Sequence, residues 1–243
     1  MAEIIYDCNN WLRRRCERGS SLRTCFAEVM GRPGTLVFDG PGGLKRRRAL
    51  YPEYKAGRKS LSSDITAQFE LFMKLAQYLP VSMIRIPGWE ADDVIATLTT
   101  FTKEMVEIMS TDADFLQLPN VRLPERDRPF PVESRYVRLY KALVGDKSDN
   151  IPGVKGFGLK AWEHLADSER DVLQTLLSGE TNLIPHTLPV GTFNWLGENL
   201  DKARMYYHIT NLFTVPMEEI LGHVSTGTFD IGAADALFME YHL

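Results

Sequence analysis

Short apolar segments that end in an acidic residue constrain the fold of this chain more than any other feature. Residues 3–7 (EIIYD) and 35–39 (TLVFD) have the pattern of a buried strand that ends in aspartate, and residues 83–87 and 105–110 are further apolar segments of strand length. Helical patterns lie between them, at residues 9–30, 65–79 and 91–102. Strands that alternate with helices predict βαβ units, so we expect an α/β fold around a mainly parallel sheet.

Acidic residues gather just past the ends of these predicted strands. Ligands of open α/β sheets bind beyond the carboxyl ends of the strands, so the acids are expected along one rim of the sheet. Asp146 and Asp149, three residues apart, would face the same way on a helical turn and extend this rim. The full set of candidate metal ligands is Asp7, Asp39, Glu90, Asp92, Asp93, Asp112, Asp114, Asp146 and Asp149.

Such a density of like charge needs a compensating cation. Carboxylates at close range raise one another's pKa and destabilise a fold, and divalent cations with oxygen-only ligands remove that conflict. Any single acid has a simpler explanation, since Asp7 or Asp112 could cap a helix and Asp39 could shape a turn. Five acidic segments in the same relation to the predicted strands favour a metal site over a set of caps.

The stretch 145–162 (GDKSDNIPGVKGFGLKAW) joins the last two acids to a glycine-rich turn. Its glycines would let backbone N–H groups approach a phosphate, and Lys155 and Lys160 would add positive charge. A G-x-x-G-x-G pattern alone is better explained as a turn after a helix. Directly beside a pair of acids, it indicates a metal site that continues into a clamp for a phosphate backbone.

Positive charge is concentrated at the start of the chain, although the net charge is −4. Residues 1–59 hold 13 basic and 6 acidic side chains, whereas residues 60–243 hold 15 and 26. Basic runs occur at residues 13–15 and 45–48. A charge run is more often a solvated face, but a basic edge segregated from an acidic metal site is expected to attract a polyanion such as nucleic acid.

The composition is that of an ordinary soluble globular protein. Apolar residues make up 44% of the chain and charged residues 25%. No apolar run approaches the ~18–20 residues that a membrane span needs, and no signal-peptide pattern opens the chain. Cys8, Cys16 and Cys25 have no C-x-x-C spacing, which indicates reduced thiols and no zinc site or disulfide frame. We therefore expect a cytoplasmic protein.

Four segments resemble motifs of one known family. They are residues 51–58 (YPEYKAGR), 87–94 (PGWEADDV), 110–118 (STDADFLQL) and 145–158 (GDKSDNIPGVKGFG). In this order they resemble the 5′-nuclease (flap endonuclease) superfamily, most closely the 5′-nuclease domain of bacterial DNA polymerase I and its stand-alone phage and bacterial relatives. The resemblance implies a PIN-like α/β nuclease domain over residues 1–144, with a helical arch at about 45–65. It further implies a helical DNA-binding domain over residues 145–243 that contains a helix–hairpin–helix motif.

The resemblance also implies a role for each matching residue. The acids named above would hold two or more Mg²⁺ or Mn²⁺ ions, with Asp93 and Asp149 as outer ligands. Lys55 and Arg58 match the basic pair at the base of the arch, which contacts the scissile phosphate. Residues 153–158 match the helix–hairpin–helix that grips the duplex backbone, often with a bound K⁺. The expected DNA contacts are Arg13, Arg14, Arg46, Arg47, Arg48, Tyr54, Gly153, Val154, Lys155, Gly156, Gly158 and Lys160.

The chain departs from the family at several positions. Six residues after the first acid, where the family has an aromatic side chain that stacks on a base, this chain has Arg13. Trp11 or the guanidinium plane of Arg13 could take that place, although core packing is the simpler explanation of Trp11. The segment 115–143 is shorter than in the polymerase domains, which predicts that a peripheral strand or helix is missing. The spacing around the arch favours a modest one, with residues 60–64 and the basic residues before them mobile without DNA.

Together these features predict a metal-dependent 5′-3′ exonuclease or flap endonuclease of DNA replication or repair. Two close metal ions would supply hydroxide at neutral pH and clamp the attacking and leaving oxygens. Lys55 and Arg58 would neutralise the non-bridging oxygens. No Ser/His/Asp or Cys/His arrangement in the sequence offers another mechanism.

The expected partners are 5′ flaps and nicked or gapped duplex DNA, with RNA primers as a further candidate, and the protein is expected to be a monomer. Two alternatives remain. The first is a branched-DNA-binding protein whose metal rim has lost catalysis, but no rim acid is replaced. The second is a PIN-like ribonuclease, which the helix–hairpin–helix motif argues against.

Overall fold

The chain divides into two units, each with a hydrophobic core of its own. The computed structural model describes residues 3–58, 62–127 and 129–242. The first of the two units, here called the sheet unit, comprises residues 1–43, 59–129 and 213–243. The second, the helical unit, comprises residues 44–58 and 130–212. This division differs from a single boundary after residue 144, because two earlier segments pack with the later helices and the last segment packs on the sheet.

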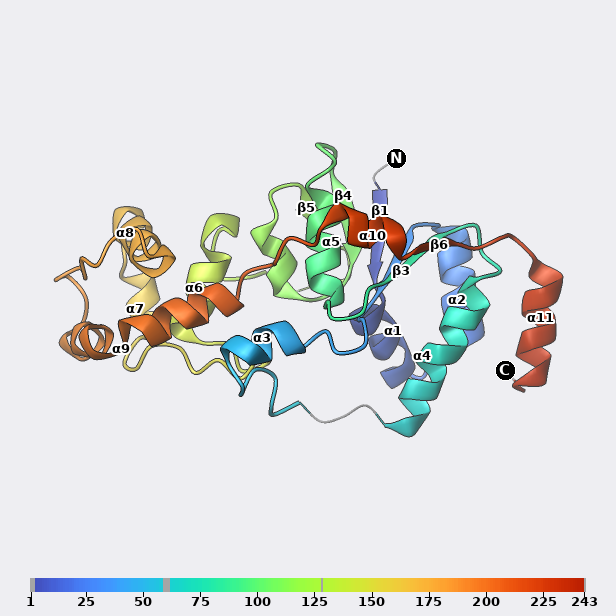
Figure 1. The fold of residues 1–243 in the computed structure, drawn as a ribbon, viewed down its shortest axis with the longest axis horizontal. Helices are drawn as coiled ribbons and strands as arrows, with labels where there is room; N and C mark the ends of the chain where they lie inside the picture. Colours follow the sequence, from blue (N-terminus) through green and yellow to red (C-terminus); the bar gives the residue numbers. More distant parts are fainter. Residues whose placement is uncertain (1–2, 59–61, 128, 243) are drawn as a thin grey trace. The chain divides into compact units, whose positions relative to one another are not determined.

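A six-stranded sheet forms the centre of the sheet unit, in the order β5-β4-β1-β2-β3-β6 (Figure 1). The strands are β1 (Glu3–Asp7), β2 (Thr35–Phe38), β3 (Ser82–Arg85), β4 (Val106–Met109), β5 (Val121–Arg122) and β6 (Val224–Thr226). All neighbours are parallel except β3 and β6. The four predicted strands and the mainly parallel α/β sheet are confirmed. Strands β5 and β6 were not predicted.

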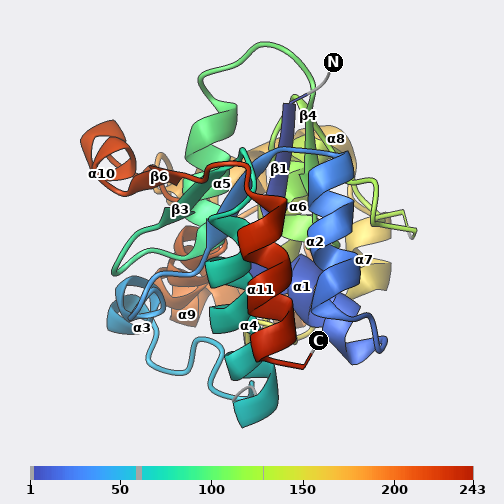
Figure 2. The same cartoon turned by 90° about the vertical axis from the view of Figure 1, so that its right-hand side faces the viewer.

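Alternating side chains of the strands build a separate core on each face of the sheet. Tyr6, Leu36 and Phe38 point to one face and pack with four helices, which are α1 (Cys8–Glu17), α2 (Leu22–Gly31), α4 (Ser63–Ala76) and α11 (Ile231–Glu240). Helices α2, α4 and α11 run side by side (Figure 2). Ile5 and Val37 point to the other face, where α5 (Ala91–Thr99) and α10 (Met217–Gly222) cover them.

The helix predicted over residues 9–30 is two helices, α1 and α2, so the prediction of a continuous helix was wrong. Gly19 ends the first with a left-handed backbone (φ +80°). Ser21 starts the second, because its Oγ accepts a hydrogen bond from the N–H of Thr24 at 3.1 Å. The predicted helices at 65–79 and 91–102 are confirmed as α4 and α5 with small shifts of their ends.

The helical unit packs its helices around buried aromatic and leucine side chains such as Tyr136, Leu139, Trp162 and Tyr206. Its helices are α3 (Lys45–Leu50), α6 (Val137–Val144), α7 (Leu159–Glu163), α8 (Asp167–Ser178) and α9 (Val190–Ile209). The predicted helical character of the chain after residue 145 is therefore confirmed for this unit.

Two shorter stretches complete the description. Between β4 and α6 the chain forms the 3-10 helices η1 (Ala113–Gln117) and η2 (Ser134–Tyr136) and strand β5. The predicted arch at about 45–65 includes residues 59–61, which lie outside the described residues. So does its predicted mobile part, residues 60–64 with the basic residues before them. Within the described parts of the chain, no helix has both the length and the apolar character that a bilayer crossing requires.

Candidate metal and nucleic-acid site

The topology of the sheet unit brings three acids to one edge. Asp7 is the last residue of β1, Asp39 directly follows β2, and Asp112 follows β4 after two polar residues. Since β4, β1 and β2 are adjacent and parallel, their carboxyl ends meet at the same edge of the sheet. Asp7 is only 3% exposed. The predicted rim of carboxylates thus begins with a buried acid at its centre.

Neutral polar side chains tie the three strand ends together. Ser110 donates its hydroxyl hydrogen to Asp7 Oδ2 at 2.7 Å, and the backbone N–H of Asn10 donates to Asp7 Oδ1 at 3.2 Å. Asn9 Oδ1 accepts the N–H of Asp39 at 2.8 Å, and Asn10 Oδ1 accepts the N–H of Thr111 at 3.1 Å. No role for Asn10 or Ser110 was expected from the sequence. A signal was present, because Ser110 directly follows β4 and Asn9-Asn10 come one residue after β1.

The fourth acidic segment joins the rim through Asp39. The backbone N–H of Ala91, the first residue of α5, donates to Asp39 Oδ1 at 2.8 Å. Glu90 occupies the N-cap position of this helix and is 2% exposed, and Asp92 is half-buried in its first turn. The start of α5 is therefore fastened next to the end of β2, and its acids are carried to the same edge.

Electrostatics confirm that the rim acids act on one another. Burial raises the pKa of Asp7, the negative charges of Asp39 and Asp112 raise it further, and the hydrogen bonds from Ser110 and Asn10 lower it, with a net rise to about 7. Burial is the larger cause of the raised pKa, and the two neighbouring carboxylates add to it. The donors are carboxylate oxygens, the set that hard divalent cations prefer. The residues present fit such ions.

Two of the rim acids, Asp7 and Asp112, also cap helices, which was the simpler explanation of each acid taken alone. Asp7 caps α1 through its bond to Asn10, and Asp112 Oδ1 accepts the N–H of Asp114 at 3.0 Å at the start of η1. Asp93 is different, because it is 1% exposed and its Oδ1 accepts the backbone N–H of Phe213 at 2.8 Å. It fastens the returning segment 213–243 to α5. Its predicted role as an outer metal ligand stays a prediction.

The two acids of the helical unit lie on a loop, so the prediction that they share a helical turn was wrong. Asp146 and Ile151 exchange two backbone hydrogen bonds of 2.8 Å, which close the loop between α6 and α7. Lys141 Nζ lies 2.8 Å from Asp146 Oδ2, and both side chains are largely buried. Burial tends to raise the pKa of Asp146, but the Lys141 ammonium and hydrogen bonds from Ser148 outweigh it and lower the pKa below its usual value.

Asp149 contacts both predicted catalytic cations. Arg58 Nη2 lies 3.0 Å and Lys55 Nζ 3.9 Å from Asp149 Oδ1. The backbone N–H of Lys55 donates to the Asp149 carbonyl at 3.0 Å, and Arg58 Nε donates to the Ser148 carbonyl at 3.2 Å. Lys55 itself has a positive φ of 54°, which is uncommon for a residue with a side chain. The segment that carries Lys55 and Arg58 is thus docked onto the loop that carries Asp149.

The glycine-rich stretch forms the turn between α6 and α7. Gly153 has φ +75°, and a Cβ there would lie 2.6 Å from the Leu143 carbonyl oxygen, so no other residue fits. Gly156 also has a positive φ, of 80°. Among the predicted DNA contacts of this turn, Val154 is buried in the core, so only its backbone could meet a ligand. The exposed members are Lys155, Gly156, Gly158 and Lys160.

The structure separates the other predicted DNA-contacting residues into exposed and structural ones. Arg46 and Arg48 are exposed, whereas Arg47 is 3% exposed and donates to the carbonyls of Ile209 at 3.0 Å and Asn211 at 2.8 Å. Tyr54 is 2% exposed and lies in the hydrophobic core of the helical unit. These two side chains hold the helical unit together.

The N-terminal basic run does not divide in this way, because its three arginines are all half-buried. Arg13 is half-buried and forms an ion pair of 3.7 Å with Glu17, and Arg14 is half-buried. Trp11 is 1% exposed, packs on Tyr6 and Phe72, and is a core residue as the simpler explanation held. It cannot stack on a base.

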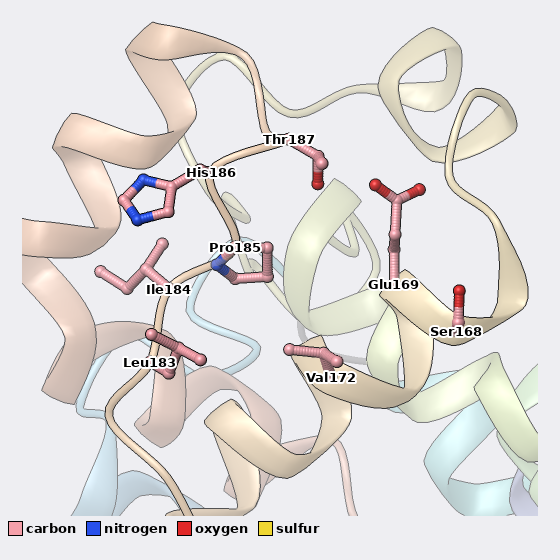
Figure 3. A pocket seen from close by; sticks show the side chains of 8 residues that line it. All are labelled: Ser168, Glu169, Val172, Leu183, Ile184, Pro185, His186 and Thr187. Atoms are coloured by element: carbon pink, nitrogen blue, oxygen red, sulfur yellow. The ribbon is translucent and has the colours of Figure 1, made fainter.

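A cavity of about 320 Å³ lies elsewhere in the helical unit (Figure 3). Val172 and Glu169 of α8 face Leu183 and Pro185 of the segment before α9 across it. The lining is mostly apolar and contains none of the predicted site residues. It does not add to the rim described above.

The known proteins that this chain resembles in sequence include 5′-3′ exonucleases and a flap endonuclease. The family model described as the N-terminal resolvase-like domain of 5′-3′ exonucleases matches residues 20–139. The flap endonuclease Xni of Shewanella sp. (strain MR-4) is 32% identical over 195 residues, which cover 74% of this chain and 72% of that protein. A 5′-3′ exonuclease of Aquifex aeolicus is 35% identical over 141 residues, 51% of this chain and 48% of that protein. This chain spans about half the length of that relative, or less of longer ones.

The solved structures agree on the fold. A bacteriophage T5 flap endonuclease, in a pseudo-enzyme–product complex with DNA and metal ions, matches with a TM-score of 0.64 over 99% of this chain and 97% of that one, at 18% identity. The fold and the acid rim define a class of α/β proteins in which carboxylates line one edge of a mainly parallel sheet. Within that class, this chain belongs to the 5′-nuclease (flap endonuclease) superfamily.

Proposed function

We propose that the protein is a metal-dependent, structure-specific nuclease that cuts phosphodiester bonds of duplex or branched DNA near 5′ ends. The observation that carries this proposal is the rim itself. Acids from separate strand ends are held at one edge by Asn9, Asn10 and Ser110, and Asp7 at its centre has a raised pKa. Family membership supports the choice of DNA as substrate, and both exonuclease and flap endonuclease activities fall within the proposal.

Two or more Mg²⁺ or Mn²⁺ ions would be held by the carboxylates. The ligands we propose are Asp7, Asp39, Glu90, Asp92, Asp112 and Asp114, with Asp146, Asp149 and Asp93 as further or outer ligands. When bound, such ions activate water and neutralise the charge that develops on the phosphate. Among the described residues, the rim supplies oxygen donors that suit hard cations better than soft ones.

Lys55 and Arg58 would bind the scissile phosphate. Arg58 presents a planar fork for two phosphate oxygens, and Lys55 supplies a compact charge. Both are placed by Asp149, so the docked segment would orient them before substrate arrives. Orientation before binding lowers the barrier, because less ordering remains for the transition state.

The turn between α6 and α7 would grip the duplex backbone away from the cut. Gly156, Gly158 and the exposed Lys155 and Lys160 offer backbone N–H groups and charge to phosphates. We propose that the sheet unit supplies most of the metal ligands and that residues 145–158 form the helix–hairpin–helix, with K⁺ as its ligand. A cytoplasmic monomer that acts in replication or repair is consistent with this, with RNA primers as a further substrate.

A 5′-flap duplex labelled at either end tests the proposal. Cleavage is expected with Mg²⁺, not with chelator, and is expected to vanish in Asp112→Asn while Glu104→Gln, an exposed acid in the loop before β4, keeps it. Product lengths separate flap cutting from stepwise removal of nucleotides. Tight binding without cleavage in Mg²⁺ or Mn²⁺ would support the inactive DNA-binding alternative, and preferential cleavage of the RNA counterpart would support the ribonuclease.

A further inference from the structure

Residues 123–127 (LPERD), which follow β5, are fastened at two points to the elements that carry the rim. Glu125 accepts two hydrogen bonds from the guanidinium of Arg15 on α1, at 2.9 and 3.2 Å. Arg126 Nη1 donates to the carbonyl oxygen of Thr111 at 2.7 Å. The segment forms a turn that contains both residues, in which the N–H of Arg126 donates to the Leu123 carbonyl at 3.1 Å. It therefore bridges α1 and the end of β4.

The first fastening is a strong one. Arg15 lies between Glu125 and Glu28 and donates to both carboxylates, with Nε and Nη2 bonds of 2.9 and 2.8 Å to Glu28. The exposed fractions of the three side chains are only 17%, 19% and 24%. Forked ion pairs of this kind fix geometry as well as charge, and at partial burial they are screened less than surface pairs. Although Arg15 belongs to the basic run 13–15, its guanidinium is bound to two carboxylates within the protein.

The second fastening acts on one peptide group of the rim. The carbonyl of Thr111 and the N–H of Asp112 belong to the same planar unit. Arg126 binds the carbonyl, and the N–H of Asp112 donates to Ser110 Oγ at 3.1 Å, the hydroxyl that also binds Asp7. With both ends held, the plane cannot rotate, and the direction in which the Asp112 side chain leaves the backbone is set.

We propose that Arg126, anchored through Glu125, is a positioning residue that fixes the peptide between Thr111 and Asp112 and so aims the Asp112 carboxylate at the metal. The proposal rests on the proposed function in requiring that Asp112 bind metal. Neither Glu125 nor Arg126 touches the metal or the substrate in this scheme. The segment lies between two of the family motifs, residues 110–118 and 145–158, so those motifs do not assign it this role.

The test uses Arg126→Ala, Arg126→Lys and Glu125→Ala in the full-length protein, with Arg122→Ala as the matched control. Arg122 is the nearby arginine of β5, with its side chain 66% exposed, and it pairs with Glu107 at 3.1 Å. Binding of Mn²⁺ is measured by calorimetry without DNA. Amide hydrogen exchange of residues 110–112 is measured in metal-free protein, and kcat and KM are measured at saturating Mg²⁺.

We expect Arg126→Ala to weaken Mn²⁺ binding about tenfold, as loss of a residue that orients a metal ligand does. Exchange of the Thr111 and Asp112 amides is expected to rise while the rest of β4 stays protected. The kcat should fall with KM for DNA unchanged, and Arg126→Lys should restore part of each effect, since an ammonium can still donate to the carbonyl. Glu125→Ala should act in the same direction, and the double variant should be little worse than Arg126→Ala alone.

Three outcomes would overturn the proposal. One is that Arg126→Ala binds Mn²⁺ and exchanges like Arg122→Ala. Another is faster exchange throughout the sheet, which would give Arg126 a merely structural role. The third is additive losses in the double variant, which would separate Glu125 from Arg126. If the wild-type protein did not cut DNA, the proposed function would fail, while metal affinity and amide exchange would still decide the role of Arg126.

Discussion

The acids of the sheet unit and those of the helical unit are held in opposite ways. Asp7 receives its hydrogen bonds from neutral donors, and the charges that act on it, Asp39 and Asp112, are negative. Asp146 and Asp149 instead lie beside the protein's own cations, Lys141 in the first case and Lys55 with Arg58 in the second. The pKa of Asp7 is raised and that of Asp146 is lowered.

This difference indicates which set depends on an external cation. Neighbouring negative charges raise the pKa of Asp7, and a bound cation would offset them, so metal binding and fold stability should be linked there. The helical-unit acids are already compensated, so their ion pairs should support the local fold whether or not metal is present. The stability that each set of acids contributes should therefore change with pH in opposite directions, and substitutions in the two sets should reveal this.

The largest effect is expected at the centre of the rim. Asp7→Asn removes a proposed metal ligand but keeps the shape of the side chain, and we expect the rate of flap cleavage to fall about 10³-fold or more, the several kcal/mol that a metal-held charge contributes. Single-turnover cleavage with excess enzyme measures it. Glu104→Gln is the control and should cleave like the wild type. A loss of less than tenfold would contradict the prediction that Asp7 binds the metal.

The stability of metal-free protein should fall as pH rises from about 4 to about 7. Asp7 binds its proton more tightly in the folded chain than in the unfolded one, because its folded pKa is raised to about 7, so deprotonation favours unfolding over this range. The upper limit of the loss is about 4 kcal/mol, at about 1.4 kcal/mol for each pKa unit. Urea unfolding with chelator at a series of pH values measures it.

Asp7→Asn should flatten this profile, and saturating Mg²⁺ should restore stability at pH 8 in the wild type only. A profile that does not change in the variant would show that another group titrates.

Lys141→Met should destabilise the protein by about 3 kcal/mol, because it leaves Asp146 largely buried without its ammonium partner. Here the sign is opposite to that at Asp7. The lowered pKa of Asp146 gives stability that is present above its unfolded pKa and is lost as pH falls through its folded pKa. Thermal unfolding at pH 8 measures the change.

The double variant Lys141→Met, Asp146→Asn should recover much of the loss at pH 8, since neither residue of the pair then carries a buried charge. Lys202→Met, an exposed lysine of α9, should change stability by less than about 0.5 kcal/mol. An equal loss in the double variant would mean that Lys141 acts through its packing.

The smallest effect on stability is expected at Arg58. Its side chain is 45% exposed, so the pair with Asp149 should contribute less than about 1 kcal/mol, and Arg58→Ala should unfold almost like the wild type. Its cleavage rate should nevertheless fall about 10²-fold at saturating Mg²⁺. Arg47→Ala is the contrasting variant, because its buried guanidinium bonds two backbone carbonyls and its loss should cost about 2–3 kcal/mol. Equal stability losses in the two would contradict the distinction.

The sequence by itself determined the sheet and the acids at its edge. Strand periodicity and the position of an acid directly after a strand are local properties, and parallel strands bring their carboxyl ends to one edge without further information. Asp7, Asp39 and Asp112 could therefore be placed together from the sequence. The motif around residues 145–158 likewise indicated the family, which the comparison with the flap endonuclease Xni then showed.

Only the tertiary structure decided what the neighbouring polar residues do. Arg15 meets Glu125 over 110 residues and Asp93 meets the backbone of Phe213 over 120, and nothing local in the sequence specifies such partners. The same is true of Arg47, which turns inward while Arg46 and Arg48 on either side are exposed. A charged side chain can bind a partner, form an ion pair within the fold or remain solvated. Its burial and the distant groups it meets decide between them, and both arise only when the chain has folded.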